Sequence, residues 1–220
     1  MRLRLALCLL LISTGTLAAD LSGTLRLFAN GKPLRESEAG EAIIYFRPKT
    51  PVLAKALAEP AVMTTRRKQF VPRVLAVTAG SAVRFPNEDP ILHNAFSTSP
   101  ENAFDTGQYG RGDGRTQVFA KPGLVRVYCN VHHSMFGFVL VLDTPFHTRA
   151  DAAGRFRLDG LPGGEGELVV FHDRGAPLKQ QLTVAPGSTI DLKLDLNKRR
   201  VPTHTNKFGK PYARTPNAHY

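Results

Sequence analysis

Along most of the chain, apolar residues alternate with polar ones in short stretches that are separated by Gly, Pro, Asn and Asp. This period of two is typical of β-strands that bury one face, and the intervening residues favour turns. The pattern predicts strands at residues 21–28, 42–47, 70–77, 81–85, 117–120, 124–128 and 138–142. Many short strands at close spacing indicate a β-sandwich. Only residues 51–63 favour a turn or two of helix.

After residue 145 the pattern changes character. Residues 148–158 predict a hairpin, residues 161–164 a turn, and residues 167–172 a buried strand. Strands at 180–184 and 189–196 complete a second group of four. The chain is long enough for one large or two small β domains.

A thiol, an imidazole and a thioether lie on one short segment, in which Cys129, His132 and Met135 are spaced by three residues. A mononuclear copper electron-transfer site uses two imidazoles, one thiolate and a weak axial thioether. One further histidine has to come from elsewhere. His93, in a proline-containing loop after the predicted strand 81–85, is the candidate. We therefore expect one copper ion held by His93, Cys129, His132 and Met135.

These motifs resemble the cupredoxins, and within them the plastocyanin-like methylamine utilization proteins. The Cys-x-x-His-x-x-Met spacing looks like the short ligand loop of amicyanin, and His93-Asn94 resembles the histidine-asparagine pair that opens the cupredoxin site. The segments 104–107 and 121–123 also fall where the family has such residues. The resemblance implies an all-β Greek-key sandwich over residues 20–143. It also implies that Asn94 ties its loop to the cysteine loop and donates near the sulfur.

Residues 144–197 resemble the carboxypeptidase regulatory-like domain, a small transthyretin-like β-sandwich. The resemblance rests on an Asp-x-x-Gly-x-Phe turn beginning at Asp151 and a Leu-Pro-Gly turn at Leu161. Residues 20–48 carry similar turns, so they could pair with either sandwich. We assign them to the copper domain. The expected order is thus a cupredoxin-like sandwich followed by a transthyretin-like one.

Both termini have distinct compositions. Residues 1–19 combine early positive charge, an apolar run and small residues, which is typical of a secretory signal peptide and predicts a periplasmic protein. No later segment approaches the ~20 apolar residues that span a membrane. Of the two cysteines, cleavage would leave Cys129 alone. The formal net charge is +11, and residues 198–220 carry six Lys or Arg and no acid. Such a tail is predicted to be disordered.

These features together predict a periplasmic type 1 (blue) copper protein. It would carry single electrons between redox proteins, such as a c-type cytochrome and a dehydrogenase. The chain lacks the His-x-His pairs of a multicopper oxidase and a Gly-x-Ser-x-Gly nucleophile motif, so we expect no enzymatic activity. Secretion argues against nucleic acid as a partner, and the tail could contact an acidic or membrane surface. The alternative is a periplasmic copper carrier, or a β-sandwich scaffold with an accessory copper site.

His133 leaves the ligand assignment open, because two histidines are adjacent in the loop. The spacing from Cys129 favours His132, and His133 is then expected to be exposed. The resemblance implies that electrons pass through the edge of the loop histidine. We expect Val131, Phe136 and Phe146 to form an apolar collar around it.

Overall fold

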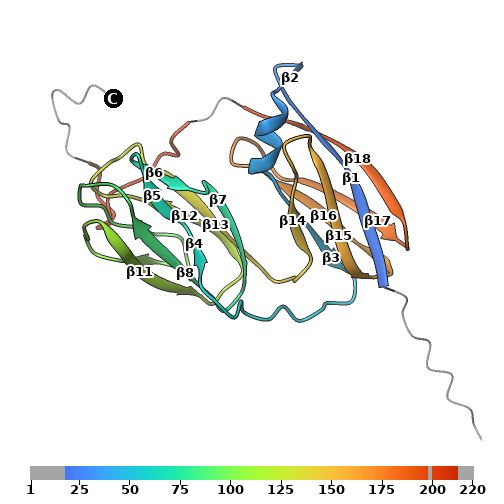
Figure 1. Cartoon of the computed structure of the whole chain (residues 1–220), viewed down its shortest axis with the longest axis horizontal. Helices are drawn as coiled ribbons and strands as arrows, with labels where there is room; N and C mark the ends of the chain where they lie inside the picture. Colours follow the sequence, from blue (N-terminus) through green and yellow to red (C-terminus); the bar gives the residue numbers. More distant parts are fainter. Residues whose placement is uncertain (1–17, 198–199, 213–220) are drawn as a thin grey trace, which may run out of the picture.

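The computed structural model describes residues 18–197 and 200–212 (Figure 1). The predicted all-β class is confirmed in this part of the chain, which forms strands β1 to β18 and one short 3₁₀ helix, η1 (Glu36–Glu41). The helical turn expected within residues 51–63 does not form, and β4 begins at Ala61. Residues 1–17 of the predicted signal peptide lie outside the described residues. None of the helical structure in the described residues is long and apolar enough to cross a bilayer.

Two β-sandwiches lie side by side (Figure 1). The outer sandwich comprises residues 18–48 and 147–196. One of its sheets has the order β15-β1-β18 with β2 beside β1, and the other has the order β14-β3-β16-β17. The strands are β1 (Ala18–Ala29), β2 (Lys32–Pro33), β3 (Ile43–Pro48), β14 (His147–Arg149), β15 (Arg155–Pro162), β16 (Gly164–Phe171), β17 (Leu178–Val184) and β18 (Ser188–Asp195). Their inward faces form a core of mostly aliphatic residues.

The inserted sandwich comprises residues 61–142. Its sheets have the orders β10-β9-β12-β13-β7 and β11-β8-β5-β6, with β4 beside β8. The strands are β4 (Ala61–Val62), β5 (Thr64–Arg66), β6 (Gln69–Val71), β7 (Val74–Thr78), β8 (Ser81–Asn87), β9 (Phe96–Ser97), β10 (Phe104–Asp105), β11 (Gly112–Phe119), β12 (Gly123–Tyr128) and β13 (Phe136–Leu142). A second core, rich in Phe and Val, fills the space between these sheets.

The N-terminal strands pair with the outer sandwich, so the expectation that residues 20–48 belong with the copper domain is wrong. β1 runs antiparallel to β15 and parallel to β18, and β3 pairs with β14 and β16. The second sandwich therefore does not simply follow the first. Leu21, Leu25 and Leu27 of β1 pack with Phe156 and Leu192 in the outer core. β1 is needed because the C-terminal strands by themselves would leave this core uncovered.

The two sandwiches share a third apolar cluster. β13 is buried at every position. Alternate side chains point to opposite faces of a strand, so Val139 and Val141 enter the inserted core while Phe138 and Leu140 face the outer sandwich. There they meet residues of β3 and β16, including Phe171. A strand buried on both faces has a nearly continuous apolar sequence, as β13 does. The inserted sandwich therefore packs on the outer sandwich through an apolar interface.

The C-terminal segment also departs from expectation. Residues 200–212 lie against the inserted sandwich, and the ring of His204 stacks on that of Tyr128 with centroids 3.9 Å apart (Figure 1). The Lys207 ammonium is 2.6 Å from Asp105 Oδ2. The prediction of a disordered tail is wrong for residues 200–212, because specific stacking and charge pairing hold them. The rest of the predicted tail, residues 198–199 and 213–220, lies outside the described residues.

Candidate metal centre

The loop between β12 and β13 holds three of the four predicted ligands, and it is closed by its own backbone. The Cys129 N–H donates to the Met135 carbonyl at 3.2 Å, and the Met135 N–H donates to the His132 carbonyl at 2.9 Å. β12 and β13 are antiparallel neighbours whose last pair is Tyr128 with Phe136. Because both strands are anchored in one sheet, the loop is held at one end of the inserted sandwich.

His93 reaches the same place from the loop between β8 and β9. Its N–H donates to the Tyr109 carbonyl at 3.1 Å, and the Tyr109 N–H donates back to the His93 carbonyl at 2.9 Å. The ring of His93 is fully buried, and its Nε2 is 3.0 Å from Oδ2 of Asp89. Holding one ring nitrogen leaves the other, Nδ1, facing Cys129. The carboxylate therefore sets the orientation of the imidazole.

Asp89 is itself held by a turn. Its carboxylate oxygens accept the backbone N–H of Arg67 at 2.6 Å and of Lys68 at 2.8 Å. Burial works to raise the pKa of Asp89, but these two N–H donors and His93 hold that pKa below its usual value. Asp89 was missed in the sequence, although an acid four residues before a candidate histidine is a visible signal. Carboxylates commonly orient metal-binding histidines.

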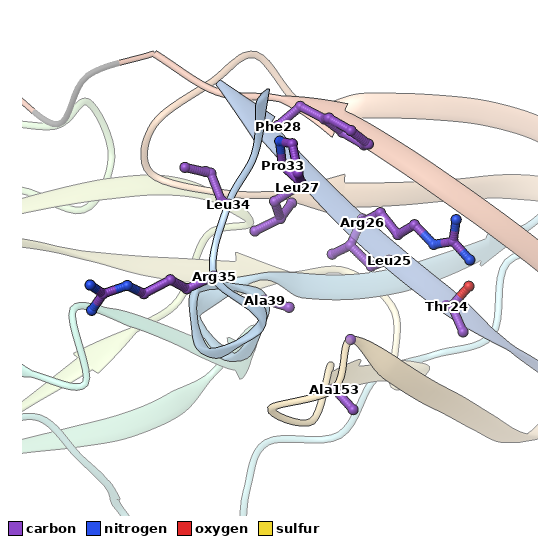
Figure 2. Close-up of a pocket in the computed structure, with 11 residues that line it drawn as sticks. Thr24, Leu25, Arg26, Leu27, Phe28, Pro33, Leu34, Arg35, Ala39 and Ala153 are labelled. Carbon is purple, nitrogen blue, oxygen red and sulfur yellow. The ribbon is translucent and has the colours of Figure 1, made fainter. Parts of the chain in front are cut away.

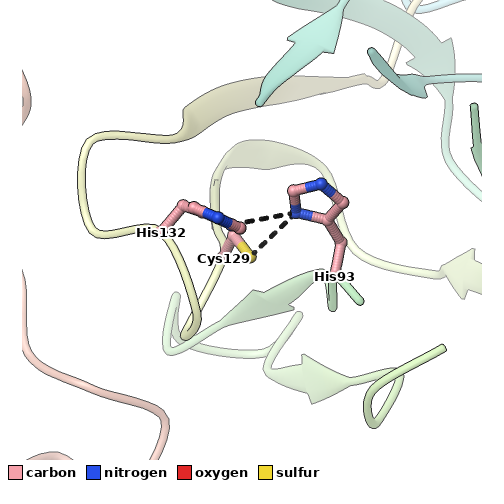
Figure 3. Close-up of side chains that lie close together, drawn as sticks. All are labelled: His93, Cys129 and His132. Atoms are coloured by element: carbon pink, nitrogen blue, oxygen red, sulfur yellow. Dashed lines mark hydrogen bonds between the residues drawn. The ribbon is translucent and has the colours of Figure 1, made fainter. Parts of the chain in front are cut away.

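The structure brings three predicted ligands together (Figure 3). His93 Nδ1 lies 3.6 Å from Cys129 Sγ and 3.2 Å from His132 Nδ1. Donor atoms of all three residues lie within 4.8 Å of one another. Cys129 is fully buried and His132 is half-buried. Two imidazole nitrogens and one sulfur are the donors that surround copper in a blue-copper site, so the residues present fit that ion.

Two further residues of the loop, Met135 and His133, bear on the ligand assignment. Met135 is 1% exposed and packs in the inserted core beside the cluster residue Cys129. Its role as the axial ligand stays a prediction. His133 is not part of the donor cluster. It is half-buried rather than exposed, because its ring packs on Tyr212 with centroids 3.6 Å apart.

Both clustered imidazoles favour the neutral form. Burial lowers the pKa of His93, and this outweighs the opposing effect of Asp89. Burial likewise lowers the pKa of His132, with further lowering by His93 and Lys68. A neutral imidazole offers a lone pair to a metal ion, whereas a protonated one offers none. At neutral pH the cluster can therefore present both nitrogens as donors.

Asn94 links the two ligand-bearing loops, although in a different manner from the one the resemblance implies. Its Oδ1 accepts the Asn130 N–H at 2.8 Å and lies 3.6 Å from Cys129 Sγ. Its Nδ2 donates to Asp105 Oδ1 at 3.0 Å. The amide oxygen, rather than the NH₂ group, faces the sulfur. Asn94 thus ties the loops together without donating to the thiol.

The expected apolar collar does not form as a unit. Val131 is 37% exposed at the surface, but Phe136 is only 5% exposed and belongs to the cluster between the sandwiches. Phe146 packs against the outer core. The sequence left Phe136 open between the surface and the core and favoured the surface for Phe146, because neither partner sheet is visible in the sequence.

A separate hollow of about 310 Å³ opens in the outer sandwich (Figure 2). Its lining is mostly aliphatic with two arginines, and includes Leu25, Arg26, Leu27, Leu34 and Arg35. None of the residues that line it is a His, Cys, Asp or Glu. This hollow therefore offers no metal ligands and no acid-base pair, and the candidate chemistry lies in the inserted sandwich.

Comparison with known proteins gave partial structural likenesses. No family model matches the chain, and no curated protein matches it. Among solved structures, the chain is similar to a Cu-containing nitrite reductase from Thermus scotoductus, at 30% identity over 42% of this chain, with a TM-score of 0.37. It spans about a quarter (25%) of that reductase. It is also similar to a purple cupredoxin from Nitrosopumilus maritimus, at 23% identity over 37% of this chain and 99% of the other, with a TM-score of 0.35. An amicyanin variant matches at 18% identity over 45% of this chain and 98% of its own, with a TM-score of 0.36.

One expectation is overturned by this comparison. The sequence led us to predict a protein without enzymatic activity. One of the matched structures is a nitrite reductase, which is an enzyme, so the exclusion of enzymatic activity was wrong.

Proposed function

We propose that the protein binds one copper ion, which His93, Cys129, His132 and Met135 would hold, and carries single electrons between redox partners. The observation that supports this proposal most directly is the convergence of two imidazoles and one thiol within 4.8 Å. Burial of the thiol is compatible with this role, because it protects from oxidation a cysteine that would be at risk if exposed in a secreted protein.

The chain's own residues prepare the site before a metal arrives. Cys129 would hold copper as a thiolate, and the neutral His93 and His132 would hold it through their ring lone pairs. Asp89 holds His93 from behind at 3.0 Å, and the loop hydrogen bond from Met135 to His132 holds the other arm. Donors fixed in this way change position little between two oxidation states, which favours rapid electron exchange.

Copper, when bound, supplies a one-electron couple between Cu(II) and Cu(I). With that couple, the site would exchange electrons with redox proteins such as a c-type cytochrome or a dehydrogenase. His132 is half-buried and is the ligand nearest the surface. Arg66, Arg67 and Lys68 form an exposed basic turn, and the charge of Lys68 lowers the pKa of His132. This basic turn favours a partner with an acidic docking face.

The proposed location is the periplasm, which depends on residues 1–19 acting as a signal peptide. Cleavage would leave Cys129 as the single cysteine of the chain. The oxidising periplasm favours disulfides between free thiols. Metal ligation and full burial would protect Cys129 there, so the location and the site support one another.

The test is a titration of the purified full-length protein with Cu(II), followed by optical and EPR spectroscopy. We expect an intense visible band that is bleached by ascorbate and returns on reoxidation. Cys129→Ser should abolish the band, because the thiolate–copper bond produces it. His132→Ala and His133→Ala are a matched pair, and only the first should remove the band.

Two results would contradict this proposal. Copper bound without the visible band would leave a copper carrier or a scaffold with an accessory site. A band that survives His132→Ala but not His133→Ala would reassign the loop ligand.

A further inference from the structure

The described C-terminal residues form a strap across the ligand-bearing loops. A turn at residues 206–210 shapes it: the Asn206 N–H donates to the Lys210 carbonyl at 2.8 Å, and Asn206 Oδ1 accepts the N–H of Phe208 at 2.9 Å and of Lys210 at 3.1 Å. This side-chain capping is a common way for Asn to fix a turn. The turn directs Lys207 toward the inserted sandwich.

Lys207 closes a ring of hydrogen bonds with three residues around the thiol. Its backbone N–H donates to Asn130 Oδ1 at 3.1 Å, and its Nζ donates to Asp105 Oδ2 at 2.6 Å. Asp105 Oδ1 accepts from Asn94 Nδ2 at 3.0 Å, and Asn94 Oδ1 accepts from the Asn130 N–H at 2.8 Å. The ring therefore runs from the strap through Asp105 and Asn94 to the residue after Cys129, and back to the strap.

Aromatic contacts also hold the strap against the ligand loop. His204 stacks on Tyr128, which precedes Cys129, with 4° between the ring planes. Tyr212 packs on His133, which follows His132. Burial, together with the nearby Cys129, raises the pKa of Tyr212 to about 12, so the phenol stays neutral. The rings of His204 and Tyr212 also contact each other, with centroids 5.3 Å apart, so these aromatic contacts form one cluster that adds to the hydrogen bonds of Lys207.

The ion pair in this ring is partly shielded from water. The side chains of Lys207 and Asp105 are 26% and 32% exposed. Burial works to raise the pKa of Asp105, but the donors Lys207, Asn94 and the Gly107 N–H hold it below its usual value. The Asp105 carboxylate is therefore charged at neutral pH, and its contact with the Lys207 ammonium is a charge-assisted hydrogen bond, which is stronger than a neutral one.

We propose that Lys207 is a positioning residue of the metal centre, reaching from the C-terminal strap to hold Asn94 through Asp105. This inference rests on the proposed function for its redox consequence, but the positioning itself needs no copper. With Lys207 in place, the amide oxygen of Asn94 stays beside the Cys129 sulfur and on the Asn130 N–H. Without it, Asp105 loses its cation and one of the donors that orient its carboxylate, so its hold on the Asn94 amide weakens. Groups that hydrogen-bond around ligands tune both affinity and potential.

The direction of the redox effect follows from charge. The oxidised site carries one more positive charge than the reduced site, so a nearby ammonium disfavours oxidation and raises the potential. Replacing Lys207 by methionine should therefore lower the midpoint potential. Arginine at this position keeps the charge and can still donate to Asp105, and should restore most of the wild-type value.

The test compares Lys207→Met and Lys207→Arg with Lys210→Met in the full-length protein. Lys210 lies in the same turn and is exposed, so it controls for a general loss of charge. In copper-free protein, hydrogen exchange of the Asn130 N–H is measured. In copper-loaded protein, the midpoint potential is measured. We expect Lys207→Met alone to speed exchange at Asn130 and to lower the potential.

Equal potential shifts in Lys207→Met and Lys210→Met would overturn the inference, because they would indicate a general charge effect. Unchanged exchange at Asn130 in Lys207→Met would overturn it as well, since Asn94 would then be held without the strap. The exchange measurement uses no copper. Failure of the wild-type protein to bind copper would therefore contradict the proposed function, whereas the positioning by Lys207 would still be tested by hydrogen exchange at Asn130.

Discussion

The two sandwiches each contain an aspartate that accepts two backbone N–H groups, and they use it differently. In the outer sandwich, Asp151 accepts from the N–H of Ala153 and of Arg155, and from the Arg155 side chain at 2.8 Å. In the inserted sandwich, Asp89 accepts from Arg67 and Lys68 and then contacts His93. The first carboxylate binds only residues within four positions of itself, whereas the second joins two distant segments.

The difference bears on the candidate site because, of these two aspartates, only Asp89 contacts a candidate ligand, His93. A carboxylate that satisfies its own turn stabilises a local loop and leaves no group oriented elsewhere. Asp89 receives its backbone donors from the β5–β6 turn, so its remaining oxygen capacity can hold His93 in one orientation. The same two-donor arrangement builds a turn in one place and supports a ligand in the other.

The largest expected effect compares the two cores. Phe46 is fully buried in the outer core and Phe85 in the inserted core. We expect each Phe→Ala substitution to lower the free energy of unfolding by about 3–5 kcal/mol, because each leaves a cavity. Urea denaturation measures the loss. Among the molecules that remain folded, Phe46→Ala should keep the wild-type copper spectrum. A changed spectrum would show that the outer core also shapes the site.

The next effect concerns the cluster between the sandwiches. Leu140 is buried there, and we expect Leu140→Ala to cost about 2–5 kcal/mol. Because this cluster couples the two sandwiches, the variant should also separate one unfolding transition into two. Differential scanning calorimetry measures this. A single transition at unchanged temperature would mean that the linkers alone couple the sandwiches.

The two aspartates offer a direct contrast. Asp89→Asn keeps the shape of the side chain but weakens its hold on His93, so copper affinity should fall about 10–100-fold. Competition with a chelator measures the affinity. Two control variants accompany it. Asp151→Asn should leave the copper affinity unchanged, and Glu88→Gln removes the charge of an exposed acid next to Asp89. Equal losses in Asp89→Asn and Glu88→Gln would point to net charge instead of orientation.

The smallest expected effect is a pH dependence of the strap. The pKa of Asp105 is lower in the folded protein than its usual value. Its contribution to stability is therefore present above the usual aspartate pKa of about 4, and is lost as pH falls through the lower folded value. For a pair this exposed we expect less than about 1 kcal/mol. Urea denaturation of wild type and Asp105→Asn should differ at pH 7 and converge near pH 2. A constant difference would assign the effect to another group.

Local patterns in the sequence predicted the strands and the donor residues. The alternation of apolar residues located long strands such as those around Leu25 and Val83, because a half-buried strand requires a period of two. A continuous apolar run located the strand around Val139, which is buried on both faces. The spacing of Cys129, His132 and Met135 indicated copper because donor chemistry is a property of the side chains themselves. His93 was predicted because such a site needs a second imidazole. Its position beside Cys129 depends on the tertiary structure.

Tertiary structure alone decided which strands pair, and therefore what surrounds those donors. The alternating leucines of β1 would fit any half-buried strand, so β1 could have joined either sandwich. It pairs with β18 through contacts between residues more than 160 positions apart, such as Leu21 with Ser188. The same holds for Asp89, which needs a distant turn, and for Lys207, whose polar, basic surroundings resembled a disordered tail until Asp105 supplied a partner. Composition and period are local properties, whereas burial and charge pairing depend on which distant segments the fold brings together.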